Sequence, residues 1–345
     1  MTIEIDGSYG EGGGQILRTS LALSAILCTP VELHHIRGGR KKPGLRPQHL
    51  VTVKAIASIT EADVKGADLG STYLSFAPRQ IRPGDYGFDI GTAGSTSLVL
   101  QCMIPTLLFA GKESRVVITG GTHVPWSPCF HYLKEVFAPA LQGMGGSLDL
   151  EIERWGWYPK GGGKVVAWIS PVPDIRAISR LRRGKIVNFF VLSAISNLPI
   201  NIAKRQRDQA IRRLHEYGIK VTKMETVNAP SPGTGTSVFV WALFEKGTAG
   251  FSSLGKKGKR AEKVADEACT EFFEFMASKC AIDDHLADQL VLYMALAKGR
   301  SLIGTKRVTT HLKTNVWVIE QFLPVKFEVE ELTGKISVEG IGFSA

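Results

Sequence analysis

Long apolar runs alternate along this chain with short stretches in which every second residue is apolar. Apolar runs of about ten residues or more favour helices, whereas alternation with a period of two favours strands. The pattern predicts helices over residues 14–27, 48–59, 95–109, 129–142, 285–298 and 316–323. It predicts strands over residues 31–36, 115–119, 147–153, 163–169, 301–304, 326–332 and 335–339, and one more at the start of the chain.

Pairs of glycines reveal an internal repeat. Gly38-Gly39 and Gly120-Gly121 each follow a predicted strand, and the offset of 82 residues between them also takes His49 to His131. A third copy near the end of the chain places His311 at the matching position. We therefore predict an α+β fold with three repeats of a two-helix, four-stranded-sheet unit of the βαβαββ type.

Residues 184–275 do not follow this repeat. Their pattern predicts a strand, a helix, two strands, a loop and a helix, over residues 185–194, 200–217, 220–225, 237–245 and 260–275. This order predicts a smaller α/β domain inserted into the repeats. The chain would then divide into residues 1–183 with repeats one and two, the inserted domain 184–275, and residues 276–345 with repeat three. The inserted segment is rich in Lys and Arg, which a solvated helix face and a charged loop also explain.

Composition narrows the class of protein. The 345 residues are 44% hydrophobic and 21% charged, as in a globular protein, and the net charge of +10 with a pI of about 9.4 suggests a polyanionic partner. Five scattered cysteines without any CxxC pair favour a reducing compartment over a zinc site or a disulfide framework. The start of the chain lacks a signal-peptide pattern, and the apolar run 98–110 is too short to span a bilayer. We expect a cytoplasmic protein without a membrane segment.

The segment 309–315, Thr-Thr-His-Leu-Lys-Thr-Asn, carries the first candidate residue. His311 lies just before the predicted helix 316–323, where backbone N–H groups and the helix dipole favour a phosphate. An imidazole at that place can act as a nucleophile toward a nucleotide. By itself the motif is short, and an ordinary polar histidine near a helix start also explains it.

A glycine-rich loop over residues 7–14 precedes the first predicted helix. It lacks the Gly-Lys-Ser/Thr ending of a Walker A loop, but its glycines let the backbone approach a ligand. Glu11 in this loop can hold a divalent metal against phosphates, and Arg18 on the following helix can reach the same anion. A plain structural turn is the alternative.

Two further clusters carry polar chemistry. His285, Asp288 and Gln289 share one face of a predicted helix, so Asp288 and Gln289 can hold a base, a ribose or an imidazole; a helix cap at Asp283-Asp284 also explains the acidic residues. The segment 37–48 places five basic residues on a glycine- and proline-rich loop, which suggests a phosphate clamp.

Taken together, these segments resemble the RNA 3′-terminal phosphate cyclases. The resemblance runs the full length of the chain and is carried by residues 10–18, 37–50, 91–95 with Gln101, 120–122, 158–163, 285–289, 310–312 and 314–315. It implies a body of three repeats like the C-terminal domain of a bacterial translation initiation factor, with a smaller inserted domain. It also implies that ATP drives the conversion of an RNA 3′-phosphate to a 2′,3′-cyclic phosphate.

The resemblance assigns roles residue by residue. His311 would accept AMP, with Glu11 as the metal-associated carboxylate and Arg18 as a phosphate contact, and the metal would be Mg²⁺ or Mn²⁺. The residues assigned to ATP are Gln101, Pro128, His285, Leu286, Ala287, Asp288, Gln289 and Tyr293. Those assigned to the phosphate at the RNA end are Arg37, Arg40 and Gln48. His123 and His131 depart from the acidic residues expected there, which affects details of the adenosine pocket.

Two alternatives belong to other classes. One is a catalytically inactive relative that binds RNA in ribosome assembly, against which His311, Glu11 and Arg18 argue. The other is an enolpyruvyl transferase, which does not need a net charge of +10. Because the loop 37–46 would not touch ATP, we expect Arg40→Ala to impair AMP transfer to RNA more than formation of the His311 adduct.

Overall fold

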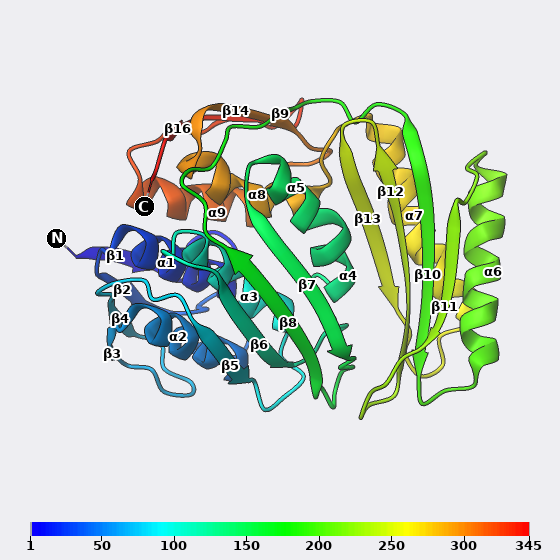
Figure 1. The fold of residues 1–345 in the computed structure, drawn as a ribbon, viewed down its shortest axis with the longest axis horizontal. Helices are drawn as coiled ribbons and strands as arrows, with labels where there is room; N and C mark the ends of the chain where they lie inside the picture. The colour runs from blue at the N-terminus through cyan, green and yellow to red at the C-terminus, as the bar shows by residue number, and fades with distance from the viewer. Residues whose placement is uncertain (1, 345) are drawn as a thin grey trace.

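Three four-stranded sheets surround most of the helices in this computed structural model, and a fourth sheet stands beside them (Figure 1). The structure describes residues 2–344. Mixed sheets combined with helices agree with the predicted α+β class. No helix in this described part of the chain is long and apolar enough to cross a membrane.

The first three sheets share one strand order. They run β1-β2-β4-β3, β5-β6-β8-β7 and β9-β14-β16-β15, and in each the first two strands are parallel while the second and third are antiparallel. The strands of the first two sheets are β1 (Ile3–Asp6), β2 (Val31–His34), β3 (Asp63–Lys65), β4 (Leu74–Ala77), β5 (Asp85–Asp89), β6 (Ser114–Gly120), β7 (Ser147–Arg154) and β8 (Gly163–Ser170). Those of the third are β9 (Ser179–Arg180), β14 (Lys298–Gly304), β15 (Glu328–Glu330) and β16 (Lys335–Ile341).

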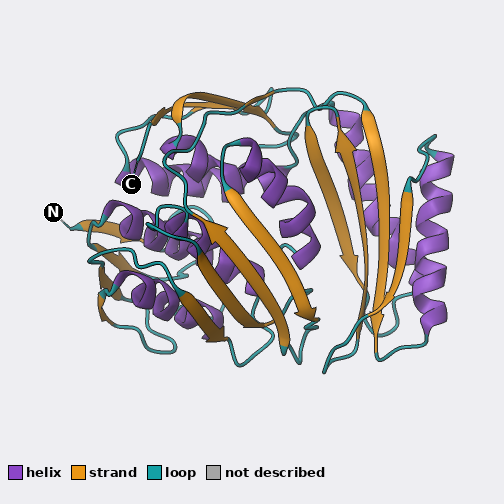
Figure 2. Ribbon diagram, in the orientation of Figure 1, coloured by secondary structure: helices purple, strands orange, loops and turns teal. Residues whose placement is uncertain are grey.

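The helices of these sheets lie toward the middle of the molecule (Figure 2). They are α1 (Gly14–Leu27), α2 (Pro47–Thr60), α3 (Thr96–Leu107), α4 (Phe130–Tyr132), the π-helical turn η1 (Leu133–Phe137), α5 (Ala138–Gly143), α8 (Asp284–Leu296) and α9 (Thr310–Phe322). Every residue of α1 from 16 to 26 is buried. Because α1 is enclosed on all sides, its apolar residues are not confined to one stripe, and Arg18, Thr19, Ser20 and Ser24 are buried with them.

The fourth sheet belongs to the segment between β9 and α8. Its strands run β11-β10-β12-β13 and its helices α6 (Ile200–Glu216) and α7 (Ala261–Ser278) cover one face. The strands are β10 (Ile186–Ser196), β11 (Lys223–Asn228), β12 (Gly235–Phe244) and β13 (Gly247–Leu254). Phe189, Val240 and Phe272 lie in a core of its own, whereas Leu192 and Phe239 on the opposite face join the main core.

Two sequence predictions are wrong in detail. Residues 247–254 form β13 and not a loop, because pairing with β12 makes a strand of a Gly- and Ser-rich stretch that has no alternating pattern. The helix expected from residue 316 begins six residues earlier, at Thr310. This earlier start brings His311 into the first turn of α9.

Candidate active site

The first turn of α9 presents His311. Thr309 caps the helix, because its hydroxyl accepts a hydrogen bond from the backbone N–H of Leu312 at 3.1 Å. His311 follows directly, so its ring lies at the positive end of the helix dipole. Its side chain is about one-third exposed, at 33%. A ligand can therefore reach the ring from solvent.

Two carboxylates flank the His311 ring. Asp288 Oδ2 on α8 lies 2.9 Å from Nδ1, and Glu11 Oε2 lies 3.9 Å from Nε2. The Asp288 contact has the length of an ion pair but is not aligned as a hydrogen bond, and Nδ1 has no other partner in the described structure. Such contacts commonly align only when the substrate is bound. Asp288 thus faces one ring nitrogen and leaves Nε2 toward the glycine-rich loop.

The glycine-rich loop is fixed against the same face of α9. Thr314, one turn after His311, accepts a hydrogen bond from the backbone N–H of Glu11 at 3.2 Å. Gly10 has a φ of +56°, and a Cβ at that position would collide with Thr314 Oγ1. Glycine is therefore required there both by backbone conformation and by close packing. These contacts hold Glu11 beside His311.

Arg18 lies buried on the second turn of α1, with only 7% of its surface exposed. Burial lowers the pKa of its guanidinium to about 10, so the group remains charged at neutral pH. Nη2 donates to Gln15 Oε1 at 2.7 Å, but Nε is buried without a partner among the described residues. A buried, charged donor that lacks a partner fits an anionic ligand.

A network that the sequence predictions missed connects α1, α8 and α9. Thr19 donates to Asn315 Oδ1 at 2.5 Å, and Asn315 Nδ2 donates to the backbone carbonyl of Asp288 at 2.6 Å. Gln15 Nε2 donates to Thr19 Oγ1 at 3.2 Å. The network fixes Arg18 relative to Asp288 and His311. Asn315 lies four residues after His311 on the same helix face and belongs to the segment 314–315 that carries the family resemblance, and these are the sequence signals that indicate it.

The basic loop reaches this site through Arg40. Its guanidinium forms an ion pair with Glu11 and lies over Gly13. The basic loop folds back onto the glycine-rich loop, where the N–H of Gly39 donates to the carbonyl of Gly12 at 3.2 Å, and this brings Arg40 beside the His311 site. The expectation that ATP does not touch this loop stays a prediction. Arg40 contacts the carboxylate nearest to Nε2.

Arg37 and Gln48 face elsewhere. Arg37 Nη1 donates to the carbonyls of Lys42 and Gly44 at 2.8 and 2.9 Å, which orders the basic loop itself. Gln48 Oε1 accepts from the backbone N–H of Ser95 at 3.0 Å and so links α2 to the start of α3. The predicted clamp residues thus do not converge as one fork in this conformation.

The start of α8 combines exposed and buried residues. Asp283 caps the helix by accepting from the backbone N–H groups of His285 and Leu286, both at 3.0 Å, as the capping interpretation predicts. His285 is exposed. Gln289 donates to the carbonyl of His285, while its Oε1 is buried and has no partner in the described structure. His285 and Gln289 are therefore available to a ligand.

Three residues assigned to ATP turn their side chains into the core. Leu286, Ala287 and Tyr293 are 1%, 0% and 2% exposed. Their side chains pack among apolar residues of the main core and face away from solvent in this conformation. Their assignment to the ATP site stays a prediction. Gln101 on α3 and Pro128 before α4 are half-buried and remain accessible.

The other two repeated histidines lie in different surroundings. His49 on α2 is 6% exposed, and burial, together with the charge of Arg18, lowers its pKa to about 3. His131 on α4 keeps an accessible edge, yet it packs on Trp155 and forms a hydrogen bond with the ring of His123 at 3.0 Å. This packing lowers the pKa of His131 to about 3.

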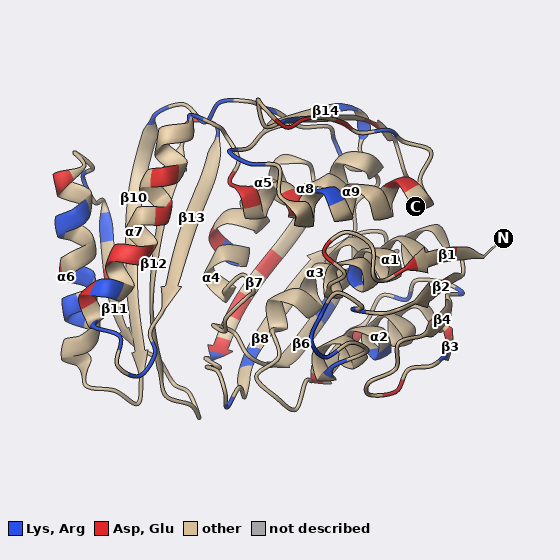
Figure 3. Ribbon diagram, turned by 180° about the vertical axis from the view of Figure 1, so that it is seen from behind, with Lys and Arg blue, Asp and Glu red and all other residues tan. Residues whose placement is uncertain are grey.

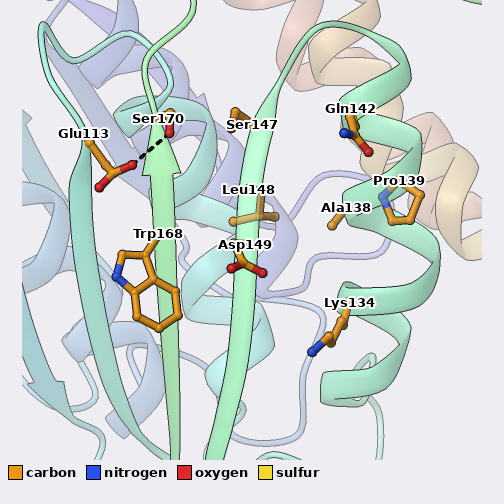
Figure 4. A pocket seen from close by; sticks show the side chains of 10 residues that line it. All are labelled: Glu113, Lys134, Ala138, Pro139, Gln142, Ser147, Leu148, Asp149, Trp168 and Ser170. Atoms are coloured by element: carbon orange, nitrogen blue, oxygen red, sulfur yellow. Dashed lines mark hydrogen bonds between the residues drawn. The ribbon is translucent and has the colours of Figure 1, made fainter.

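A hollow on the second sheet lies elsewhere. It has a volume of about 510 Å³ and lies between β7, β8 and α5, where Asp149, Trp168 and Gln142 are among its lining residues (Figure 4). It contains none of the candidate residues. Its mixed polar lining shows no convergent reactive groups, so we place the chemistry at His311.

Several basic residues of the middle segment form ion pairs with nearby carboxylates. Helix α6 carries mostly blue positions and α7 mostly red ones (Figure 3). Arg205 pairs with Glu262 at 2.8 Å and Arg213 with Asp266 at 3.3 Å, both across the two helices. This arrangement agrees with the solvated-face interpretation of these charges.

The chain is similar over nearly its full length to known proteins of one family. A family model described as RNA 3′-terminal phosphate cyclase matches residues 9–329. The chain is 45% identical over its full length to an RNA 3′-terminal phosphate cyclase of Pyrobaculum aerophilum, and the alignment covers 100% of both chains. It is 46% identical to that of Thermococcus kodakarensis over 96% of each chain. Among solved structures, the enolpyruvyl transferase NikO from Streptomyces tendae aligns with 99% of this chain and 49% of its own at a TM-score of 0.40 and 9% identity.

Proposed function

This chain belongs to the RNA 3′-terminal phosphate cyclase family, and on that premise we propose that it converts an RNA 3′-phosphate to a 2′,3′-cyclic phosphodiester through AMP carried on His311. The observation that carries the proposal is the arrangement at the start of α9. His311 lies between Asp288 and Glu11, and Arg18 nearby is buried with an unpaired donor.

In the first step His311 Nε2 attacks the α-phosphorus of ATP. The N–P bond forms as the bond from that phosphorus to the bridging oxygen breaks, and pyrophosphate leaves. Asp288, opposite Nδ1, favours the tautomer with the proton on Nδ1, which leaves a lone pair on Nε2. The same carboxylate stabilises the positive charge that the ring acquires. Arg18 offers its free Nε–H to a phosphate oxygen.

The next two steps consume the adduct. An oxygen of the RNA 3′-phosphate attacks the phosphorus of the bound AMP and the N–P bond breaks, which restores His311. The terminal 2′-OH then attacks the activated 3′-phosphorus and gives up its proton, the cyclic phosphodiester forms, and AMP leaves. Arg40, Arg37 and Gln48 are our candidates for holding the RNA end, and Arg40 lies nearest to Glu11.

The nucleotide would lie between the exposed residues of α8 and the loop before α4. His285 is exposed, Gln289 has a free acceptor, and Gln101 and Pro128 are half-buried. Asp288 is already committed to His311. This leaves His285, Gln289, Gln101 and Pro128 as the residues that would contact the adenosine.

Glu11 is our candidate for the divalent metal, Mg²⁺ or Mn²⁺. The described residues contain no group of three His, Cys, Asp or Glu side chains that could hold a metal by themselves. One carboxylate beside a nucleotide site nevertheless fits Mg²⁺, which is commonly held by one or two carboxylates together with substrate phosphates. A bound metal would neutralise the charge of the triphosphate. Glu11 would meanwhile have to exchange its ion pair with Arg40.

We also propose that the three sheets of identical strand order are copies of one unit. Residues 1–183 and 276–345 would form the body of the enzyme and residues 184–275 an inserted unit. The common strand order and the separate core around Phe189 and Phe272 support this division.

Labelling with ATP that carries ³²P at the α-phosphate tests the function. The protein with a divalent metal should become covalently labelled without RNA, and addition of an oligoribonucleotide with a 3′-phosphate should discharge the label and yield the cyclic end. An RNA with a 3′-OH should leave the label in place. A terminal 2′-deoxynucleotide with a 3′-phosphate should stop at the RNA adenylate, because the attacking 2′-OH is missing. A protein that binds RNA but never becomes labelled would be the inactive relative.

A further inference from the structure

Trp126 is one of the most exposed large apolar side chains among the described residues. It is 94% exposed, and its backbone has a φ of +61°. Pro125 and Trp126 form a turn in the loop between β6 and α4. The position after proline in a turn with positive φ usually holds glycine or asparagine. A tryptophan there costs backbone strain and gains no burial, so fold stability does not explain it.

The base of this loop is rigid although its tip is exposed. The backbone N–H of Phe130 donates to the Thr122 carbonyl at 3.0 Å and closes the loop. His123 stacks on Trp155 with ring centres 4.0 Å apart, and Val124 is 6% exposed. The indole is therefore presented to solvent from a fixed frame. Such preorganisation is typical of a binding residue.

The loop lies between the two halves of the proposed reaction site. At its start, Gly121 donates through its N–H to the Gly94 carbonyl at 2.7 Å, next to Ser95, which Gln48 contacts. At its end, Tyr132 on α4 donates to Asp283 at 2.7 Å, beside His285. The two ends of the loop are thus anchored beside the candidate residues for the RNA end and beside those for the nucleotide.

We propose that Trp126 stacks on a base near the 3′ end of the RNA substrate, an inference that rests on the function proposed above. An indole can stack on any base, so it holds RNA without reading its sequence. The net charge of +10 favours a polyanionic ligand over an apolar one.

Binding of RNA tests the proposal directly. We would measure the anisotropy of a 5′-labelled oligoribonucleotide with a 3′-phosphate, in the absence of ATP, against the full-length protein. Trp126→Ala should weaken binding roughly 5- to 150-fold, since base–aromatic stacking contributes about 1–3 kcal/mol. Trp126→Phe should restore most of the affinity. Leu332→Ala is the matched control, because Leu332 is also fully exposed at 103% but lies in the turn before β16.

An abasic site moved along the last nucleotides identifies the stacked base. The wild-type protein should lose affinity at one position, and Trp126→Ala should lose none there. Unchanged RNA affinity of Trp126→Ala would overturn the proposal. So would normal RNA binding combined with a raised KM for ATP in self-labelling, because the indole would then hold the adenine of ATP.

Stability separates this role from a structural one. Trp126→Gly should leave the melting temperature unchanged or higher, because glycine accepts the positive φ without strain, while RNA affinity falls as in Trp126→Ala. A lower melting temperature with unchanged RNA affinity would show that the indole serves the fold. Failure of the proposed function is a distinct result: the wild-type protein would then not label with ATP, whatever the RNA affinities.

Discussion

Helices α4 and α9 each carry a histidine as their second residue, but the two histidines lie in opposite surroundings. His131 on α4 packs on Trp155 and bonds to His123, and burial lowers its pKa to about 3. His311 on α9 is one-third exposed and lies 2.9 Å from Asp288. One site is made of aromatic rings, the other of carboxylates and an open face. The position alone therefore does not make a nucleophile; its neighbours do.

The first helix of each unit supplies much of this difference. Its fifth residue is Arg18 in α1, Leu100 in α3 and Asp288 in α8. His49 on α2 thus lies near a cation, Arg18. Burial lowers the pKa of His49, and the positive charge of Arg18 lowers it further. His311, in contrast, lies near an anion, Asp288. A carboxylate can stabilise the positive charge that an imidazole gains when it takes up AMP. A guanidinium or a leucine cannot.

The largest effect should come from His311→Ala. Removal of the attacking nitrogen leaves no acceptor for AMP, so covalent label should fall to background, while His131→Asn should retain labelling per folded molecule. Gel autoradiography after incubation with α-labelled ATP and metal measures both variants. Label that persists in His311→Ala, or vanishes in a folded His131→Asn, would reverse the assignment of the two histidines.

Asp288→Asn should produce the next largest loss. The amide would present an N–H to Nδ1, which favours the tautomer with the proton on Nε2 and removes the attacking lone pair. We expect the rate of self-labelling to fall roughly 10²- to 10⁴-fold, the range for a group that sets the proton position of a catalytic histidine. Single-turnover labelling measures the rate. A variant within tenfold of the wild type would mean that Asp288 only supports the packing of α8.

Glu11→Gln should have a smaller effect that depends on the metal. The amide keeps the size of the side chain and removes the charge, so one charge-assisted contact of about 1.5–3 kcal/mol is lost, equivalent to roughly 10- to 150-fold. A titration of Mg²⁺ or Mn²⁺ in the labelling assay should shift to higher concentration. An unchanged titration with a normal rate would make Glu11 a residue of the turn alone.

Sequence reasoning succeeds where local pattern decides the structure. The predicted helix 14–27 is observed as α1 with the same bounds, because a long apolar run bounded by glycine needs no other information. Local pattern does not predict the first turn of α9, because β-branched Thr309 and Thr310 with His311 form a poor helix start by propensity. The cap at Thr309 and the packing of Thr314 on the glycine-rich loop override that propensity.

Local sequence pattern likewise predicts only part of the candidate site. Helical spacing predicts that Asp288 can hold a base, a ribose or an imidazole, and the structure places it against the imidazole of His311. The ion pair between Arg40 and Glu11 did not follow, because it depends on how the two loops fold against each other. Nor did the burial of Tyr293, since a helix enclosed on all sides gives no periodic signal for its inward face. Contacts between distant segments are set by packing that local pattern does not encode.

The smallest expected effect concerns stability in acid and the ring of His131. Burial lowers its pKa in the folded protein to about 3, below the value of about 6.5 in an unfolded chain. Between these values the unfolded chain binds a proton that the folded protein does not, so this contribution to stability is fully present above pH 6.5. It is lost as the pH falls toward 3, by up to about 1.4 kcal/mol per pH unit.

Urea unfolding at pH 7 and pH 5 should therefore show a shallower pH dependence for His131→Asn than for the wild type. The difference in unfolding free energy between the two proteins at pH 7 serves as the control, because it measures the packing that the substitution removes. An equal slope in both proteins would mean that solvent at the accessible edge of His131 lets the folded protein take up the proton, and the contrast with His311 would then rest on geometry alone.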